Sequence, residues 1–277
     1  MNAPELLPLI DIQSQIDTRQ LPIQAVGVKG VRYPVRLRAA HAGHASHAGQ
    51  GRSIDTVGQW TMSVGLAATV KGTHMSRFIE LLEAPRDALD LPGFAAMARE
   101  MLQRLGADSG RISVQFPYFL RKAAPVSGVE SLLDIDVTWA CHIPAKGAEP
   151  ELSVTLTVAA TSLCPCSKEI SAYGAHNQRS HITLNVQLRQ AMSIEELARV
   201  AEDSASCAVY GLLKRVDEKH VTERAYDNPK FVEDLVRDVA LALAAEPRVK
   251  AYKVEVENFE SIHNHSAFAT IGGHRDD

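Results

Sequence analysis

The 277-residue sequence contains few cysteines, no long apolar run and no excess of basic charge. Its four cysteines, Cys141, Cys164, Cys166 and Cys207, are too sparse for a disulfide scaffold, so we expect them to be reduced thiols. No segment approaches the roughly 18 apolar residues of a membrane span, and the first residues lack the cationic start of a secretory signal. These absences predict a cytoplasmic protein without a membrane partner.

The balance of charge excludes one further class of partner. Lysine and arginine together number 29, against 33 aspartates and glutamates, which gives a net charge of −4. The chain therefore lacks the global basic field that attracts nucleic acid. An anionic ligand must instead be bound by a local cluster of cations.

The pattern of apolar residues predicts an α+β fold. Stretches such as "ELSVTLTV" and "YKVEVENF" alternate apolar and polar residues, as half-buried strands do, and pairs of helical stretches lie between pairs of strands. We interpret residues 1–25 as an arm, 26–148 as a first strand–strand–helix–helix–strand–strand unit, and 149–277 as a second. Adjacent strands with short turns favour antiparallel sheets that are covered by helices on one face.

A low-complexity segment interrupts the first unit. Residues 39–52, "AAHAGHASHAGQGR", are rich in alanine, glycine and histidine, which is typical of a flexible loop. Its three histidines, His41, His44 and His47, are potential metal ligands, but a flexible loop cannot hold ligands in a fixed geometry. We therefore expect an exposed insertion without a catalytic role.

The starts of two helices in the second unit are predicted from short capping patterns. Ser193 followed by Glu196 is typical of a capping box and predicts a helix over 193–213. Asn228 followed by Pro229 predicts that the next helix begins there, because asparagine is a preferred N-cap and proline is tolerated in the first turn.

The long connection "TSLCPCSKEISAYGAHNQRS" (161–180) carries the main candidate chemistry. Long ordered loops tend to carry function, and this one places Cys164, Cys166 and His176 between two predicted strands. A thiolate and an imidazole, joined by a carboxylate, suit zinc or a similar divalent ion. Two interpretations stay open for each residue: Cys164 is a ligand or nucleophile, or a buried apolar thiol, and His176 is a ligand or an ordinary loop histidine.

Two further segments contain groups of the required kind. "LKRVDEKHVTERAYDNP" (213–229) is dense in charge and offers a third ligand, although a solvated surface is the default interpretation of such a run. "ENFESIHNHSAFATI" (257–271) places His263 and His265 two residues apart with Glu260 close by. Paired imidazoles of this kind move protons near neutral pH, and a polar surface turn is the alternative. The candidate ligands in the charged run are Asp217, Glu218, His220 and Glu223.

Four motifs together resemble one known family, GTP cyclohydrolase type IB, a metal-dependent group of enzymes. The motifs are "SLCPCSKEISAYGAHNQRSH", "KGTHMSRF" (71–78), "YDNPKFVEDLVRD" (226–238) and "ENFESIHNHSAFA" (257–269). The resemblance runs from about Val26 to Ala269, and segment 39–52 looks like an insertion relative to it. It implies a tunnelling fold whose units assemble into barrels, and a homotetramer with active sites at subunit interfaces.

The resemblance also implies roles for individual residues. Cys164, His176 and Glu218 match the ligands of one divalent metal ion, which can be Zn, Mn or Fe(II), with water in the open position. Glu233 matches the carboxylate that binds the guanine ring; without the resemblance it reads as an exposed helix residue. His263 and His265 match the proton-transfer histidines with Glu260 close by, and Cys166 matches a second active-site thiol. Surface charge is the alternative for the cations that could contact the triphosphate, which are Lys71, His74, Arg77, Lys168 and Arg179.

The implied reaction converts GTP and water into 7,8-dihydroneopterin triphosphate and formate, at the start of tetrahydrofolate and pterin biosynthesis, without a redox cofactor. One rival function is an NADPH-dependent deazaguanine nitrile reductase of the same fold superfamily, which uses a cysteine nucleophile and no metal. A metal-binding protein without catalysis is the other. A reductase would not need the set of metal ligands formed by Cys164, His176 and Glu218. The presence of this set therefore favours the cyclohydrolase over the reductase.

Overall fold

A computed structural model describes residues 11–13, 15–38 and 53–275, so the predicted insertion at 39–52 and its three histidines lie outside the described residues. The described residues form one nine-stranded sheet with the order β1-β2-β3-β4-β5-β6-β8-β9, in which β7 pairs with β5. Neighbouring strands are antiparallel. The strands are β1 (Ile23–Arg38), β2 (Ser53–Leu66), β3 (Gly110–Ala123), β4 (Glu130–Ile143), β5 (Glu151–Leu163), β6 (Asn177–Leu188), β7 (Cys207–Ala208), β8 (Val249–Phe259) and β9 (Ala267–His274).

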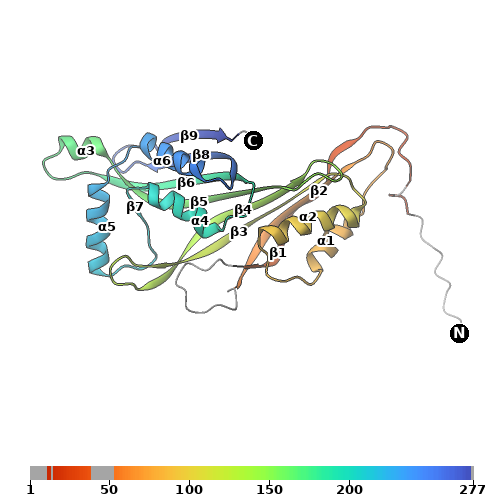
Figure 1. The fold of residues 1–277 in the computed structure, drawn as a ribbon, viewed down its shortest axis with the longest axis horizontal. Helices are drawn as coiled ribbons and strands as arrows, with labels where there is room; N and C mark the ends of the chain where they lie inside the picture. The colour runs from red at the N-terminus through yellow and green to blue at the C-terminus, as the bar shows by residue number, and fades with distance from the viewer. Residues whose placement is uncertain (1–10, 14, 39–52, 276–277) are drawn as a thin grey trace.

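Helices lie over one face of this long sheet, whereas the helices over 165–170 and 215–227 lie toward one end of it (Figure 1). Two of the helices follow β2, so the first half has the predicted order of strands and helices, whereas the second half has three helices and the short strand β7 between β6 and β8, and one further helix between β5 and β6. None of the helices in the described ranges is long and apolar enough to cross a membrane. The helices are α1 (Ser76–Glu83), α2 (Leu91–Leu105), α3 (Pro165–Ile170), α4 (Ile194–Ser204), α5 (Arg215–Asp227) and α6 (Val232–Ala245).

The two halves share a continuous sheet, because β4 pairs with β5 from Asp136 opposite Thr157 to His142 opposite Glu151. The predicted boundary after residue 148 falls in the turn between these strands, and the division into two units stays a prediction. The predicted α+β class with antiparallel pairing is confirmed. The predicted assembly into barrels concerns several chains and also stays a prediction.

Alternation along the strands explains why one face packs against helices. In β6 every second residue is buried and the residues between are exposed or half-buried, as the period of a strand requires. The core beneath the first pair of helices is aromatic: Phe94 of α2 lies 6.3 Å from Trp60 and 5.8 Å from Trp139, measured between ring centroids. Burying a large apolar side chain contributes about 1.5–3 kcal/mol, so this cluster fixes α2 on the sheet. The residues on the other, open face of β6 are exposed or half-buried.

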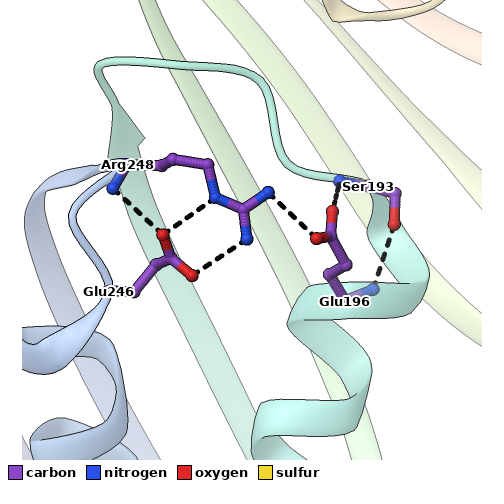
Figure 2. Close-up of polar contacts among 4 residues, drawn as sticks. All are labelled: Ser193, Glu196, Glu246 and Arg248. Carbon is purple, nitrogen blue, oxygen red and sulfur yellow. Dashed lines mark hydrogen bonds and ion pairs between the residues drawn. The ribbon is translucent and has the colours of Figure 1, made fainter.

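The helix ends confirm some capping patterns. α2 begins after Asp90, whose carboxylate accepts a hydrogen bond from the Gly93 amide at 2.8 Å, and ends at Gly106 with φ of 61°. At the start of α4, the Ser193 hydroxyl accepts from the Glu196 amide at 3.1 Å, and the Glu196 carboxylate accepts from the Ser193 amide at 2.8 Å (Figure 2). The predicted capping box is therefore present.

Two helix boundaries differ from the sequence-based predictions. α4 ends at Ser204 instead of continuing to residue 213, because the chain leaves the helix to pair Cys207 with Thr161 of β5. Asn228 does not cap α6: it is the C-cap of α5, and α6 begins at Val232 after Phe231. The physical reason is that the residue before a proline is pushed away from helical angles, so an Asn–Pro pair stops a helix as readily as it starts one.

Candidate active site

The connection between β5 and β6 places Cys164 beside His176. The two strands remain paired up to Leu163 and Asn177, and the next contact continues this ladder: the Cys164 amide donates to the His176 carbonyl at 3.1 Å. The Ser167 hydroxyl closes the same turn, because it donates to the Cys164 carbonyl at 3.1 Å and accepts from the His176 amide at 3.2 Å. Two of the predicted metal ligands therefore stand together at one end of the sheet.

Local backbone chemistry explains the position of the thiol. Cys164 is the N-cap of α3, and its sulfur accepts a hydrogen bond from the Ser167 amide at 3.4 Å. Pro165 occupies the first turn, where its missing N–H would have had no partner in the helix. Cys164 is half-buried and Cys166 is exposed. The four cysteines of the chain all lie in the described ranges, and all are free thiols.

The imidazole of His176 has two neighbours on its Nδ1 side. The Gln178 Oε1 atom lies 3.1 Å from Nδ1, and the Ser261 hydroxyl lies 3.3 Å from it. Ser261 belongs to the connection between β8 and β9, the segment with the predicted proton-transfer histidines. The histidine of the β5–β6 connection thus contacts that segment directly.

The two predicted proton-transfer histidines are close to each other. The rings of His263 and His265 stack with their centroids 5.3 Å apart. A carboxylate oxygen of Glu260 lies 3.9 Å from Nδ1 of His263, and Glu260 is much less exposed than the imidazole. The structure therefore brings these three predicted residues together, and Ser261 connects them to His176.

The third predicted metal ligand, Glu218, lies apart from the first two. It is an exposed residue in the first turn of α5, and it lines a shallow groove of its own helix with Lys219 and Thr222. Among residues 11–13, 15–38 and 53–275, no group of three or more histidine, cysteine, aspartate or glutamate side chains is arranged to hold a metal ion. A single chain therefore assembles two members of the expected ligand set and not the third.

Asp217, beside Glu218, has a structural role. It is fully buried, and its carboxylate accepts hydrogen bonds from the amides of Val126, Ser127 and Lys214 at 2.8 to 2.9 Å and from the Ser127 hydroxyl at 2.6 Å. Burial acts to raise the pKa of Asp217, but these hydrogen bonds outweigh it and hold the pKa well below its usual range. Its oxygens are occupied, so it is a poor ligand, and it fastens α5 to the β3–β4 turn.

The predicted substrate contacts in the second half surround the same end of the sheet. Lys168 donates to the carbonyl of Tyr226 and lies 4.2 Å from the centroid of its ring, which ties α3 to the end of α5. Arg179 is exposed on the open face of β6, opposite Thr161 on one side and Phe259 on the other. Glu233 is exposed in the first turn of α6.

The remaining predicted cations lie elsewhere in the chain. Lys71, His74 and Arg77 surround the start of α1, which lies toward the opposite end of the long axis from α3 (Figure 1). Lys71 donates to Gln15 at 3.1 Å, His74 lies 3.4 Å from Asp11, and Arg77 donates to the Arg104 carbonyl at 3.0 Å. His74 and Arg77 line a cavity of about 460 Å³. Within one chain, these cations do not meet the Cys164–His176 pair.

Solved structures with a similar fold define the fold class. Urate oxidase from Bacillus sp. TB-90 superposes with a TM-score of 0.51 at 8% identity, covering 92% of this chain and 100% of that one. Uricase from Arthrobacter globiformis gives 0.50 at 9% identity, covering 91% and 94%. At such low identity the likeness shows the fold alone. The chain has the tunnelling fold that the sequence predicted.

Sequence comparison identifies the family. The Type I GTP cyclohydrolase folE2 model matches residues 9–269. GTP cyclohydrolase FolE2 1 of Dechloromonas aromatica is 60% identical over 275 residues, which is 99% of each chain. GTP cyclohydrolase FolE2 of Burkholderia ambifaria is 56% identical over 98% of this chain and 96% of its own, and that of Bordetella pertussis is 54% identical over 99% and 100%. The chain belongs to the type I GTP cyclohydrolase FolE2 family, which confirms the resemblance found in its motifs.

Proposed function

We propose that the protein is a GTP cyclohydrolase of folate biosynthesis, which converts GTP and water into 7,8-dihydroneopterin triphosphate and formate. Its membership of the FolE2 family supports this reaction over the nitrile reductase and over a protein without catalysis. The observation that supports the site is the adjacency of Cys164 and His176, with Ser261 joining them to the His263–His265 loop. Thiol, imidazole and paired histidines are the groups that metal-assisted hydrolysis requires.

We infer that Cys164, His176 and Glu218 hold one divalent ion, for which zinc, manganese and iron(II) are the candidates. The donor chemistry fits, because thiolate, imidazole and carboxylate together suit these ions. Glu218 does not lie beside the other two in a single chain, so the proposal requires that ion binding or subunit assembly brings a Glu218 to them. When bound, such an ion supplies a Lewis acid that lowers the pKa of a coordinated water.

The protein side chains then supply binding and proton transfer. His263 or His265 donates a proton to the imidazole-ring nitrogen of guanine, which makes C8 electrophilic, and Glu260 orients His263. The carboxylate of Glu233 accepts two hydrogen bonds from the N1–H and the 2-amino group of guanine. Cys166, exposed in the first turn of α3, is a second thiol at the same site.

The triphosphate contacts support an interfacial site. Lys168 and Arg179 lie in or beside the β5–β6 connection of their own chain, whereas Lys71, His74 and Arg77 lie at the start of α1, toward the other end of the chain. These three residues near α1 can contact a GTP molecule bound beside Cys164 and His176 only if the α1 end of one subunit approaches the α3 end of another. This arrangement supports a homo-oligomer, for which we propose a tetramer with active sites between subunits.

The test is a GTP assay on metal-stripped protein that is supplied again with zinc, manganese or iron(II). Formate release and the fluorescence of oxidised neopterin report turnover. We expect metal-dependent turnover that Cys164→Ala abolishes and that Cys141→Ala, at a buried thiol of β4, retains. Absence of turnover with every ion would refute the proposal, and oxidation of NADPH with a nitrile substrate would then be measured.

A further inference from the structure

A row of polar side chains is buried where the sheet is otherwise apolar. Ser162 and Ser180 are 0% exposed, Asn258 is 2% and Gln178 is 7%. They lie on β5, β6 and β8, on the same face as buried residues such as Ile182, and they are cross-strand neighbours at the end of the sheet that carries the β5–β6 connection. A buried polar group is costly unless it is hydrogen-bonded, so four of them in one place require a physical reason.

The row forms a continuous series of hydrogen bonds that ends at the candidate metal ligand. Ser180 Oγ donates to Asn258 Oδ1 at 2.7 Å, and the hydroxyls of Ser162 and Ser180 are 2.7 Å apart. Gln178 Nε2 donates to Ser162 Oγ at 3.2 Å. Gln178 Oε1 then lies 3.1 Å from Nδ1 of His176.

The direction of this series decides where the histidine carries its hydrogen. A hydroxyl has one hydrogen to donate, and Ser180 donates its hydrogen to Asn258. Ser162 must therefore donate to Ser180 and accept from the Gln178 amide nitrogen. Gln178 consequently turns its carbonyl oxygen toward His176, and a carbonyl only accepts.

The Nδ1 atom of His176 therefore carries the hydrogen, and Nε2 keeps its lone pair. If every hydrogen bond of the series ran in the opposite direction, the hydrogen of the neutral imidazole would lie on Nε2 instead. An Nε2 atom that carries a hydrogen has no lone pair with which to bind a metal.

We propose that Gln178 is a positioning residue for the metal centre, which holds His176 in the Nδ1–H tautomer through the buried series of Ser162, Ser180 and Asn258. The inference rests on the proposed function, because it takes His176 as a ligand. Ligating histidines generally donate their second ring N–H to an acceptor, which fixes the tautomer and the orientation of the ring.

The series of hydrogen bonds also links His176 to the β8–β9 connection, which carries the predicted proton-transfer histidines. Asn258 is the penultimate residue of β8, two positions before Glu260, and Ser261 lies 3.3 Å from the same Nδ1 of His176. One side of the imidazole is therefore held from β6 and from the β8–β9 connection at once. This arrangement fixes the position of the ligand relative to the histidine pair.

The experiment measures zinc affinity of the full-length apoprotein by competition with a chromogenic chelator. Gln178→Met keeps the size of the side chain but removes the acceptor, and we expect the affinity to fall by about 10- to 100-fold. Gln178→Glu keeps an oxygen facing Nδ1 and is expected to bind zinc at least as tightly as the unmodified protein. Thr183→Val is the matched control. It removes a hydrogen bond of 3.0 Å between the hydroxyls of Thr183 and Thr157, which joins the same two strands at a position away from His176.

The outcomes separate this inference from the proposed function. Thermal unfolding of each apoprotein establishes that the variant is folded. Unchanged affinity in folded Gln178→Met, or an equal loss in Thr183→Val, would overturn the positioning role. If Gln178→Met does not fold, Gln178→Glu decides, and a loss of more than about ten-fold in that variant would overturn it. His176→Ala tests the ligand itself: unchanged zinc affinity there would refute the proposed ligand set and the inference with it, whereas a loss in His176→Ala without one in Gln178→Met refutes the inference alone.

Discussion

Replacing Arg248 by methionine should destabilise the second half of the chain in a pH-dependent way. The guanidinium donates through Nε and Nη2 to the Glu246 carboxylate at 2.8 and 2.9 Å, and through Nη1 to Glu196 at 2.9 Å (Figure 2). Glu196 belongs to the capping box with Ser193. Arg248 therefore joins the end of α6 to the start of α4, and methionine would remove these bonds while keeping most of the aliphatic stem.

The magnitude follows from the pKa of Glu246, which is lowered from 4.5 to about 2, first by the side-chain hydrogen bond from Arg248. One pKa unit corresponds to about 1.4 kcal/mol, so the shift sets an upper limit of about 3 kcal/mol. The pair is partly solvated, with side chains 21% and 29% exposed, and exposed ion pairs contribute only about 0–1 kcal/mol each. We therefore expect Arg248→Met to lower the free energy of unfolding by about 1–2 kcal/mol near neutral pH.

The sign of the pH effect follows from the same shift. The folded-state pKa of Glu246 is below its unfolded value of 4.5, so its contribution is present above that pH and is lost as the pH falls toward about 2. Urea unfolding of native and variant protein should show a stability difference near neutral pH that narrows in acid. A difference that is equal at both pH values would refute the electrostatic reasoning. Arg36→Met, at an exposed pair with Asp55, is the control and should change stability much less, because solvent screens this pair.

Three further predictions concern the core, the thiols and the α5 anchor. Phe94→Ala should lower the free energy of unfolding by about 3–5 kcal/mol in urea titrations, because the ring is fully buried, whereas Phe119→Ala at an exposed ring should cost far less. Cys166 should react with iodoacetamide in the native protein, as mass spectrometry would show; Cys141 should react only after unfolding, because burial raises its pKa to about 11. Asp217→Asn should speed amide exchange in the β3–β4 turn; unchanged exchange would contradict its role as an anchor.

The sequence predicts strands and helix starts correctly where a single local pattern of residues dominates. The strict alternation of β6 and the capping box at Ser193 each point to one structure. The helix α5 was hidden, since its residues are charged around most of its surface and show little apolar periodicity. Asn228 and Pro229 fit both the end of α5 and the start of α6, so the sequence pattern alone does not distinguish the two positions. Tertiary contacts decide between them: the Asn228 side chain donates to the carbonyls of Ala205 and Ser206.

The candidate site was predictable in part, because motifs identify reactive side chains better than the groups that orient them. The adjacency of Cys164 and His176 follows from a connection between paired strands. The sequence placed this connection over 161–180, whereas β5 continues to Leu163 and β6 already begins at Asn177. Gln178 was missed, although a signal existed: it and Ser180 occupy the buried phase of β6, which continues with Ile182. Polar residues at core positions of a strand are uncommon and need partners. The placement of Glu218 could not be read from sequence, since it depends on the buried contacts of Asp217.

The surroundings of the Cys164–His176 pair support the proposal that a second chain completes the site. Large apolar side chains are exposed around it: Ile170 is 84% exposed, Tyr173 101% and Ile262 65%. Exposed apolar side chains grouped in this way mark surfaces that bind another protein. Ring opening of guanine benefits from exclusion of bulk water, which strengthens the interactions between charged groups. Contact with a second chain would bury these apolar side chains and close the site. Subunit assembly would therefore explain both the exposed apolar side chains and the distance of the predicted triphosphate-binding cations near α1 from the Cys164–His176 pair.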